Sequence, residues 1–131
     1  MLFTKAGWKD YRDKLLPIIQ ATEKRNSHLF SDEINKALSK GRAFLFVGED
    51  GFFVLQPISR KGIVTVNVMF AFNWESNAID RYQSTIEQLS REIGARGLEL
   101  TTAVKGLVLL LEAHGWRQTN SDRIMHWTKI L

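Results

Sequence analysis

The most regular hydrophobic pattern in the chain lies between residues 77 and 94. Apolar side chains recur there at spacings of three and four, which puts them on one face of a helix: Ile79, Tyr82, Ile86, Leu89 and Ile93. Asn77 is placed to cap the first turn of this helix, and Gly94 is placed to end it. The spacing therefore predicts one long amphipathic helix in the second half of the chain.

Weaker helical patterns occur on both sides of it. Near the N-terminus the same spacing predicts a helix through Trp8, Tyr11, Leu15 and Ile18. Pro17 falls inside that pattern, and we expect it to kink or restart the helix because proline has no backbone N–H. A second helix should begin with Ser31 as its N-cap and end at Gly41. A fourth should follow Thr102 and close at Gly115.

Three apolar runs in the middle of the chain predict strands. They are separated by tight turns, as in an antiparallel meander, and they cover residues 43–47, 52–58 and 63–72. The third run is apolar at nearly every position, so we expect a central strand with both faces buried. Shorter strands are predicted at 98–101, 116–119 and 123–131.

The predicted order of elements is ααβββαβαββ. A parallel step from the third strand to the fourth needs a crossover helix, and the remaining neighbours can pair antiparallel. We therefore expect an α/β (α+β) fold with a mixed, mostly antiparallel sheet and helices on both of its faces.

Composition limits what the chain can do. With 131 residues it can bury a core without metal or disulfide staples, and we expect a single domain over residues 1–131. The absence of cysteine excludes disulfides, thiolate zinc sites and cysteine nucleophiles. The three histidines lack the spacing of metal ligands, so no metal site is expected. Neither a signal peptide nor a membrane span is visible, and we expect a cytoplasmic protein.

The positive charge is uneven. Residues 1–45 hold nine Lys or Arg against five Asp or Glu, a balance of +4 that equals the net charge of the whole chain. Such an excess attracts nucleic acid, an acidic protein or a phosphate-bearing ligand. The alternative is an ordinary solvated helical surface, which we favour because the charges are interspersed with other residues.

One segment near the C-terminus resembles a known family. Leu110-Leu111-Glu112-Ala113-His114-Gly115-Trp116 is similar to the L-Y-E-x-x-G-F segment of the GNAT (Gcn5-related N-acetyltransferase) superfamily. The order of elements is also similar to that of the superfamily over nearly the whole chain. This resemblance implies a GNAT fold, acetyl-CoA as cofactor and N-acyl transfer as the reaction.

The family's cofactor motif is degenerate here. GNAT enzymes hold the diphosphate of acetyl-CoA on backbone N–H groups with the pattern Arg/Gln-x-x-Gly-x-Gly/Ala. The matching stretch, residues 72–81, has no glycine and carries Glu75 and Asp80 where an anion would bind. If the protein did bind acetyl-CoA, the resemblance would assign the contacts to Phe70, Phe72, Trp74, Asn77 and Arg81.

The family's acid–base residues are also altered. Leu111 stands where GNAT enzymes commonly carry a tyrosine that protonates the departing thiolate, and leucine cannot donate a proton. For a general base, the resemblance leaves Glu99 as the candidate, with His114 or His126 as substitutes.

These observations lead to two hypotheses of different classes. The first is a non-catalytic GNAT-fold protein that needs no cofactor and acts through protein–protein contacts, with Phe70, Phe72 and Trp74 filling the cofactor cavity. The alternative is a divergent acetyl-CoA-dependent N-acyltransferase that uses Glu99 as its base.

Two further expectations concern partners. A nucleic-acid partner for the basic N-terminal third is a third hypothesis. The small size, the lack of cysteine and the degenerate motif also resemble GNAT-like accessory proteins of tailed bacteriophages, including head-assembly proteins of short-tailed phages, which would place the protein in the host cytoplasm during virion assembly. The sequence leaves the oligomeric state open.

Overall fold

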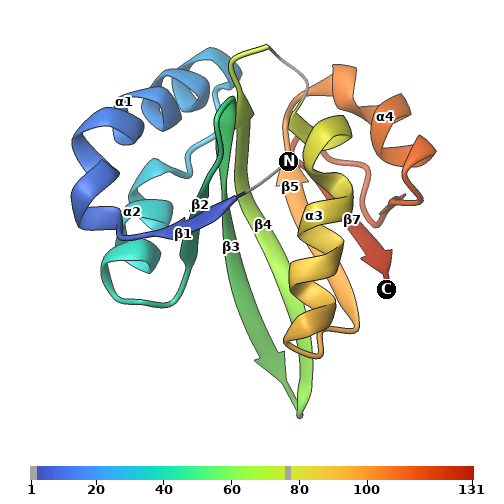
Figure 1. Ribbon diagram of the computed structural model, residues 1–131. Helices are drawn as coiled ribbons and strands as arrows, with labels where there is room; N and C mark the ends of the chain where they lie inside the picture. Colours follow the sequence, from blue (N-terminus) through green and yellow to red (C-terminus); the bar gives the residue numbers. More distant parts are fainter. Residues whose placement is uncertain (1–2, 76–77) are drawn as a thin grey trace.

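A seven-stranded sheet runs through the molecule in the order β1-β2-β3-β4-β5-β7-β6 (Figure 1), counted over residues 3–75 and 78–131, which the computed structural model describes. The strands are β1 (Thr4–Ala6), β2 (Phe44–Val47), β3 (Gly51–Arg60), β4 (Ile63–Asn73), β5 (Gly97–Thr102), β6 (Arg117–Gln118) and β7 (Met125–Ile130). All neighbouring strands pair antiparallel except β4 and β5, which pair parallel. The predicted mixed, mostly antiparallel sheet is confirmed, and β4 is its central strand.

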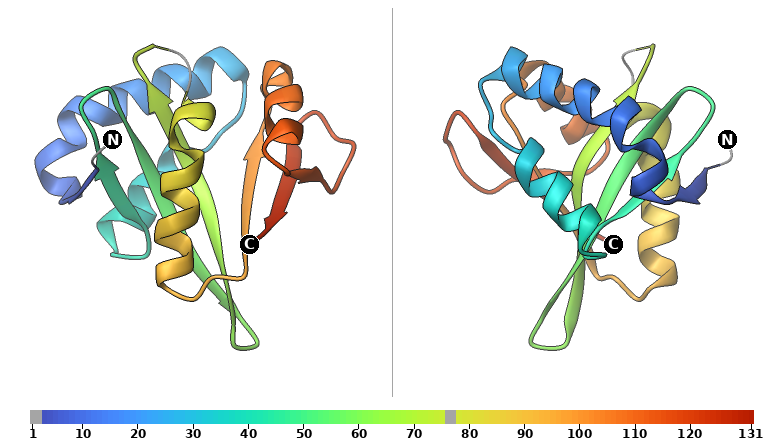
Figure 2. Two further views of the ribbon diagram at one scale, coloured as in Figure 1. Left: turned by 45° about the vertical axis from the view of Figure 1, so that its right-hand side comes forward. Right: turned by 90° about the vertical axis from the view of Figure 1, so that its left-hand side faces the viewer.

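Helices cover both faces of this sheet (Figure 2). They are α1 (Trp8–Asn26), α2 (Ser31–Ser39), α3 (Ala78–Glu92), the 3-10 turn η1 (Lys105–Leu107) and α4 (Val108–Ala113). One core cluster joins the sheet to α1 and α2 through Leu15, Ile19 and Ile34, and the other joins it to α3 and α4 through Tyr82 and Leu111. No helix in the described ranges is both long and apolar enough to span a membrane.

The structure adds one strand that the sequence pattern did not predict. Strand β1 is only three residues long, too short for a periodic signal, and it pairs with β2 at the edge of the sheet. Just before it, the ring of Phe3 packs 4.7 Å from the rings of both Phe53 and Tyr82, measured between centroids. The N-terminus is therefore held by the core as well as by strand pairing.

Three local predictions need correction. Pro17 does not restart the first helix, because α1 runs without a break from Trp8 to Asn26. Ser31 is the first residue of α2 and not its N-cap; its N–H donates to the Glu23 carboxylate at 3.0 Å, so a side chain from α1 satisfies this helix end. Ile93 lies beyond the end of α3 and is 53% exposed.

A β-bulge divides the central strand. Leu55 pairs with Val68 and Val54 pairs with Phe70, which leaves Met69 as an extra residue on β4. Before the bulge, Val68 faces the core under α3, whereas after it Phe70 faces the core under α1 and α2. Because one residue is inserted, the second half of β4 presents the opposite alternation of side chains.

Strands β4 and β5 stay together over a short distance only. Their parallel pairing covers residues 65–67 against 97–99, and above this β5 pairs with β7 alone. The two central strands therefore separate beside the bulge, and the left view of Figure 2 shows them spreading toward the end where α3 begins.

The C-terminal end of α2 is held by a tight turn. The N–H of Arg42 donates to the carbonyl of Ala37 at 2.8 Å, and the N–H of Gly41 donates to that of Leu38 at 3.3 Å. These two bonds form a Schellman motif, which requires a left-handed residue, and Gly41 has a φ of 71°. The predicted helix end at Gly41 is confirmed in this form.

We expect the substitution Gly41→Ala to lower the free energy of unfolding by about 1–2 kcal/mol, because a Cβ is strained in the left-handed region. Space is not the cause, since an added Cβ would meet no atom within 4 Å. Gly106→Ala is the matched control: it is equally unobstructed and has no positive φ. Urea denaturation of both variants measures the difference, and equal effects would contradict this account of the turn.

Candidate functional site

A groove opens where β4 and β5 separate. Its inner part has a volume of about 140 Å³ and lies between residues 68–71 of β4, residues 100–104 at the end of β5, and the end of α1 with the residues after it. Its outer part, of about 300 Å³, continues to the start of α3 and to α4. The two parts share Asn26, Phe70 and Ile79 among their lining residues, so they form one continuous depression.

The groove is lined mostly by apolar side chains. Arg25 is the single Lys, Arg, Asp or Glu among the described residues that line either part. Phe70 and Phe72 line the groove as side walls, but Trp74 does not reach it. Trp74 is instead 51% exposed and packs edge-on against Phe72, with 5.3 Å between ring centroids. The expectation that Phe70, Phe72 and Trp74 fill the cavity is therefore wrong for Trp74, and the groove stays open.

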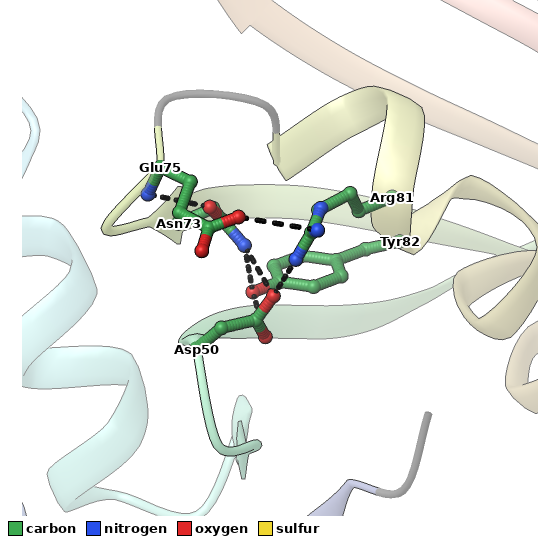
Figure 3. Close-up of polar contacts among 5 residues, drawn as sticks. All are labelled: Asp50, Asn73, Glu75, Arg81 and Tyr82. Carbon is green, nitrogen blue, oxygen red and sulfur yellow. Dashed lines mark hydrogen bonds and ion pairs between the residues drawn. The ribbon is translucent and has the colours of Figure 1, made fainter.

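A polar cluster surrounds the start of α3 (Figure 3). The carboxylate of Asp50, in the β2–β3 turn, accepts hydrogen bonds from the Tyr82 hydroxyl at 2.9 Å and from Asn73 Nδ2 at 2.8 Å. It also pairs with the guanidinium of Arg81, which in turn pairs with Glu75 at 3.1 Å. The cluster thus ties the β2–β3 turn, the end of β4 and the first turn of α3 together.

The same cluster uses the backbone of the β4–α3 connection. The N–H of Trp74 donates to the backbone carbonyl of Asp50 at 2.9 Å, and the N–H of Glu75 donates to Asn73 Oδ1 at 2.6 Å. Two backbone donors of the stretch that would hold a diphosphate are therefore bonded within the protein. Asn77, predicted as helix cap and cofactor contact, lies outside the described residues.

Burial, hydrogen bonding and charge shift the pKa values of Asp50 and Tyr82 in this cluster. Partial desolvation acts to raise the pKa of Asp50, but donors on Tyr82, Asn73 and Arg81 outweigh it and hold that pKa below its usual value. Burial, and then the negative charge of Asp50, raise the pKa of Tyr82 to about 12. At neutral pH the cluster therefore consists of an ionised Asp50 and a neutral Tyr82 that donates to it.

The sequence pattern missed this cluster because its members meet only through tertiary pairing. In the sequence, Asp50-Gly51 is a pair typical of a tight turn between two strands, and nothing local links Asp50 to Asn73 or Tyr82. The β3–β4 register sets Gly51 opposite Asn73, which brings the turn to the end of β4. Gly51 has no room for a side chain, because a Cβ there would overlap the Phe72 carbonyl and the Tyr82 hydroxyl. The glycine of the Asp-Gly pair was the available signal.

Glu99, the predicted base, lies on the other side of the β4–β5 split. It forms a two-point ion pair with Arg60, with both N–O distances 3.3 Å, and its side chain is 25% exposed. Glu99 and His126 both line a cavity of about 320 Å³ beneath α2. The structure therefore brings Glu99 and His126 to one cavity, which also shares Met69 and Thr101 with the inner groove.

The other two candidates for acid–base chemistry are held elsewhere. His114 is the C-cap residue of α4, and its Nε2 lies 3.0 Å from Asp80 at the start of α3. Leu111 is fully buried in the core between α4 and the sheet. Gly115, with a φ of 85°, ends this segment as predicted. Among the residues described, no three His, Asp or Glu gather in a way that could hold a metal ion.

The pH dependence of stability tests the cluster. A tyrosine that titrates near 10 in the unfolded chain and near 12 in the folded one contributes its full stabilisation below pH 10. That contribution is lost as pH rises from 10 to 12. We expect the urea midpoint to fall over this range, and Tyr82→Phe to remove part of the fall. Tyr11→Phe, which alters the chain's other tyrosine, should leave the full slope in place; equal slopes in the wild type and Tyr82→Phe would contradict the cluster.

Comparison with known proteins identifies the architecture. No protein-family model matches the sequence, and no curated protein matches it. Among solved structures, the chain is similar to FeeM, an N-acyl amino acid synthase from uncultured soil microbes, with a TM-score of 0.75 and 12% identity over 99% of this chain and 89% of that chain.

Two further structures have the same arrangement. A GNAT-family acetyltransferase from Listeria monocytogenes matches with a TM-score of 0.64 and 14% identity over 99% of this chain and 94% of that one. N-acetylglutamate synthase from Neisseria gonorrhoeae, solved with coenzyme A and N-acetyl-glutamate, matches with a TM-score of 0.68 and 11% identity over 100% of this chain and 35% of that one. The chain therefore has the GNAT fold.

Proposed function

We propose that this protein is a non-catalytic member of the GNAT fold that acts by contact with another protein. The observation that carries the proposal is the state of the β4–α3 connection. Its amides at Trp74 and Glu75 are bonded internally, and its nearest cation, Arg81, is paired with two carboxylates. A diphosphate held at a helix start needs free amides and uncompensated positive charge.

The local charge also opposes a diphosphate. Asp50, Glu75 and Asp80 surround the start of α3, where Arg81 is paired with two of them; Arg25 of α1, which lines the outer groove, is a second cation at this end. To reach Arg81, a phosphate would have to displace Asp50 or Glu75 from it. The α3 dipole favours an anion by only about 0.3–1 kcal/mol at an exposed helix end. Two unit charges 4 Å apart repel by about 1–4 kcal/mol at or near a protein surface, so the acidic groups outweigh the dipole.

The second support is the missing proton donor. Leu111 stands at the position of the family's tyrosine and is buried in the core, where it packs and does no chemistry. A protein that keeps this fold without a diphosphate site and without the proton-donating tyrosine can still bind other proteins through its surface. The resemblance to accessory and head-assembly proteins of tailed bacteriophages makes virion or packaging proteins the first partners to try.

A specific observation favours a second candidate, a divergent acetyl-CoA-dependent N-acyltransferase. The groove between β4 and β5 is open, and the cavity that holds Glu99 and His126 meets it across the strand split. In that case Phe70 and Phe72 would line the cofactor, and Glu99 would remove a proton from an amine acceptor after releasing Arg60. The solved structures similar to this chain are acyl-transferring enzymes, which supports this reading as well.

Isothermal titration calorimetry with coenzyme A and with acetyl-CoA separates the two candidates. We expect no binding at micromolar concentrations, because the Trp74 and Glu75 amides and the Arg81 guanidinium are already bonded within the protein. An active GNAT acetyltransferase titrated in parallel is the positive control. A micromolar dissociation constant for this protein would contradict the non-catalytic proposal.

Label transfer from acetyl-CoA to a panel of amines tests the second candidate directly. If that candidate were correct, Glu99→Gln would lower transfer by about 10²–10⁴-fold, the usual contribution of a general base. Glu112→Gln removes an exposed carboxylate of α4 and should leave transfer unchanged. We expect no labelled product with any acceptor; transfer that depends on Glu99 but not on Glu112 would establish the enzyme.

A further inference from the structure

We propose that a groove at the C-terminal end of α2 docks an acidic segment of a partner protein. This inference rests on the proposed function, since it names the surface and the chemistry of the contact. The groove has a volume of about 370 Å³ and lies between the C-terminal half of α2, the residues after it and Gln56 of β3. Its lining residues are Glu33, Lys36, Ala37, Lys40, Arg42 and Gln56.

Backbone geometry brings the three cations together. Lys36 and Lys40 lie one helical turn apart, and the N–H of Lys40 donates to the carbonyl of Lys36 at 3.0 Å. The left-handed turn at Gly41 then reverses the chain, so that the N–H of Arg42 bonds back to Ala37 at 2.8 Å. Because this turn is closed by hydrogen bonds, the charge cluster is set by the fold.

The three cations of the groove are not neutralised by ion pairs in the part of the chain that the structure describes. Within residues 3–75 and 78–131, none of Lys36, Lys40 and Arg42 takes part in an ion pair. The lining therefore carries three positive charges against the single carboxylate of Glu33.

Helix capping explains only part of this arrangement. Positive charge in the last turn of a helix complements its dipole, which accounts for Lys36 and Lys40. Arg42 lies past the end of α2 and still lines the same groove. An acidic side chain that entered the groove would find two ammonium groups and a guanidinium converging from the helix and from the chain after it.

The lining favours an acidic peptide over a nucleic acid. Single-stranded nucleic acids bind through aromatic side chains on which their bases stack. Among the described residues that line this groove there is no aromatic ring. Glu33 would also repel a continuous phosphodiester chain, whereas a peptide can set individual carboxylates beside Lys36, Lys40 and Arg42. The interaction surface fits a segment with two or three Asp or Glu residues close together.

A fluorescein-labelled decaglutamate peptide is the probe, and fluorescence anisotropy at about 50 mM salt is the measurement, because screening is weak at this ionic strength. The groove variant is Lys36→Gln/Lys40→Gln/Arg42→Gln. The matched control, Lys9→Gln/Arg12→Gln/Lys14→Gln, removes the same charge from exposed positions of α1. We expect the groove variant to weaken binding by about tenfold or more and the control by less than about threefold, since only the former removes direct partners. Thermal unfolding by circular dichroism verifies that both variants fold.

Three results would overturn the docking site. They are no binding of decaglutamate to the wild type, an equal loss in the control variant, or binding of an oligothymidine of the same length that is as tight and equally lost in the groove variant. The last result would assign the groove to nucleic acid. The coenzyme A titration is independent of this experiment, so failure of the docking site and failure of the non-catalytic assignment give different results.

Discussion

The carboxylate of Asp50 determines what the start of α3 can do. It lies in the β2–β3 turn, and it accepts hydrogen bonds from Asn73 at the end of β4 and from Tyr82 in α3. Its ion pair with Arg81 also neutralises the guanidinium that lies beside the β4–α3 connection. In a GNAT fold this connection is where the resemblance places the cofactor's diphosphate. This partly exposed ionic contact therefore links three elements and, in our proposal, opposes the binding of a second anion.

The central sheet keeps the geometry that the fold uses for a ligand. A bulge at Met69 reverses the alternation of β4, and the parallel pairing with β5 ends after residues 65–67. The split leaves an open, mostly apolar groove next to a polar cavity that contains Glu99. The architecture is thus retained, while the Trp74 and Glu75 amides and the Arg81 guanidinium are bonded within the protein. In our proposal this scaffold acts through its surface, and the groove lined by Lys36, Lys40 and Arg42 is the part of that surface that we assign to a partner.

Much of the fold was predictable because its signals are local. The 3.6-residue period of Ile79, Tyr82 and Ile86 specified α3, and the nearly continuous apolar run of β4 specified the centre of the sheet. Strand β1 was not predictable, since three residues give no period and its pairing depends on β2. The N-cap of α2 was misassigned for a similar reason, because the true acceptor is Glu23 on a neighbouring helix.

The residues that the site lacks could be predicted from the sequence, whereas the contacts that form it could not. Missing glycines and Leu111 are visible in the sequence, but the contacts among Asp50, Asn73 and Tyr82 depend on the register of β3 against β4. Likewise, no spacing rule indicates that Trp74 turns outward and leaves the groove open. Long-range pairing decides these points, and periodicity carries no information about it.

The most direct test of the central claim is an NMR titration of the ¹⁵N-labelled protein with coenzyme A, followed at the backbone amides of Trp74, Glu75 and Ala78. If Asp50 and its partners hold the start of α3 closed to a second anion, these amide resonances will not shift as the nucleotide is added. Saturating shifts at these amides, with broadening of the Arg81 side-chain signal as Asp50 is displaced, would contradict the account.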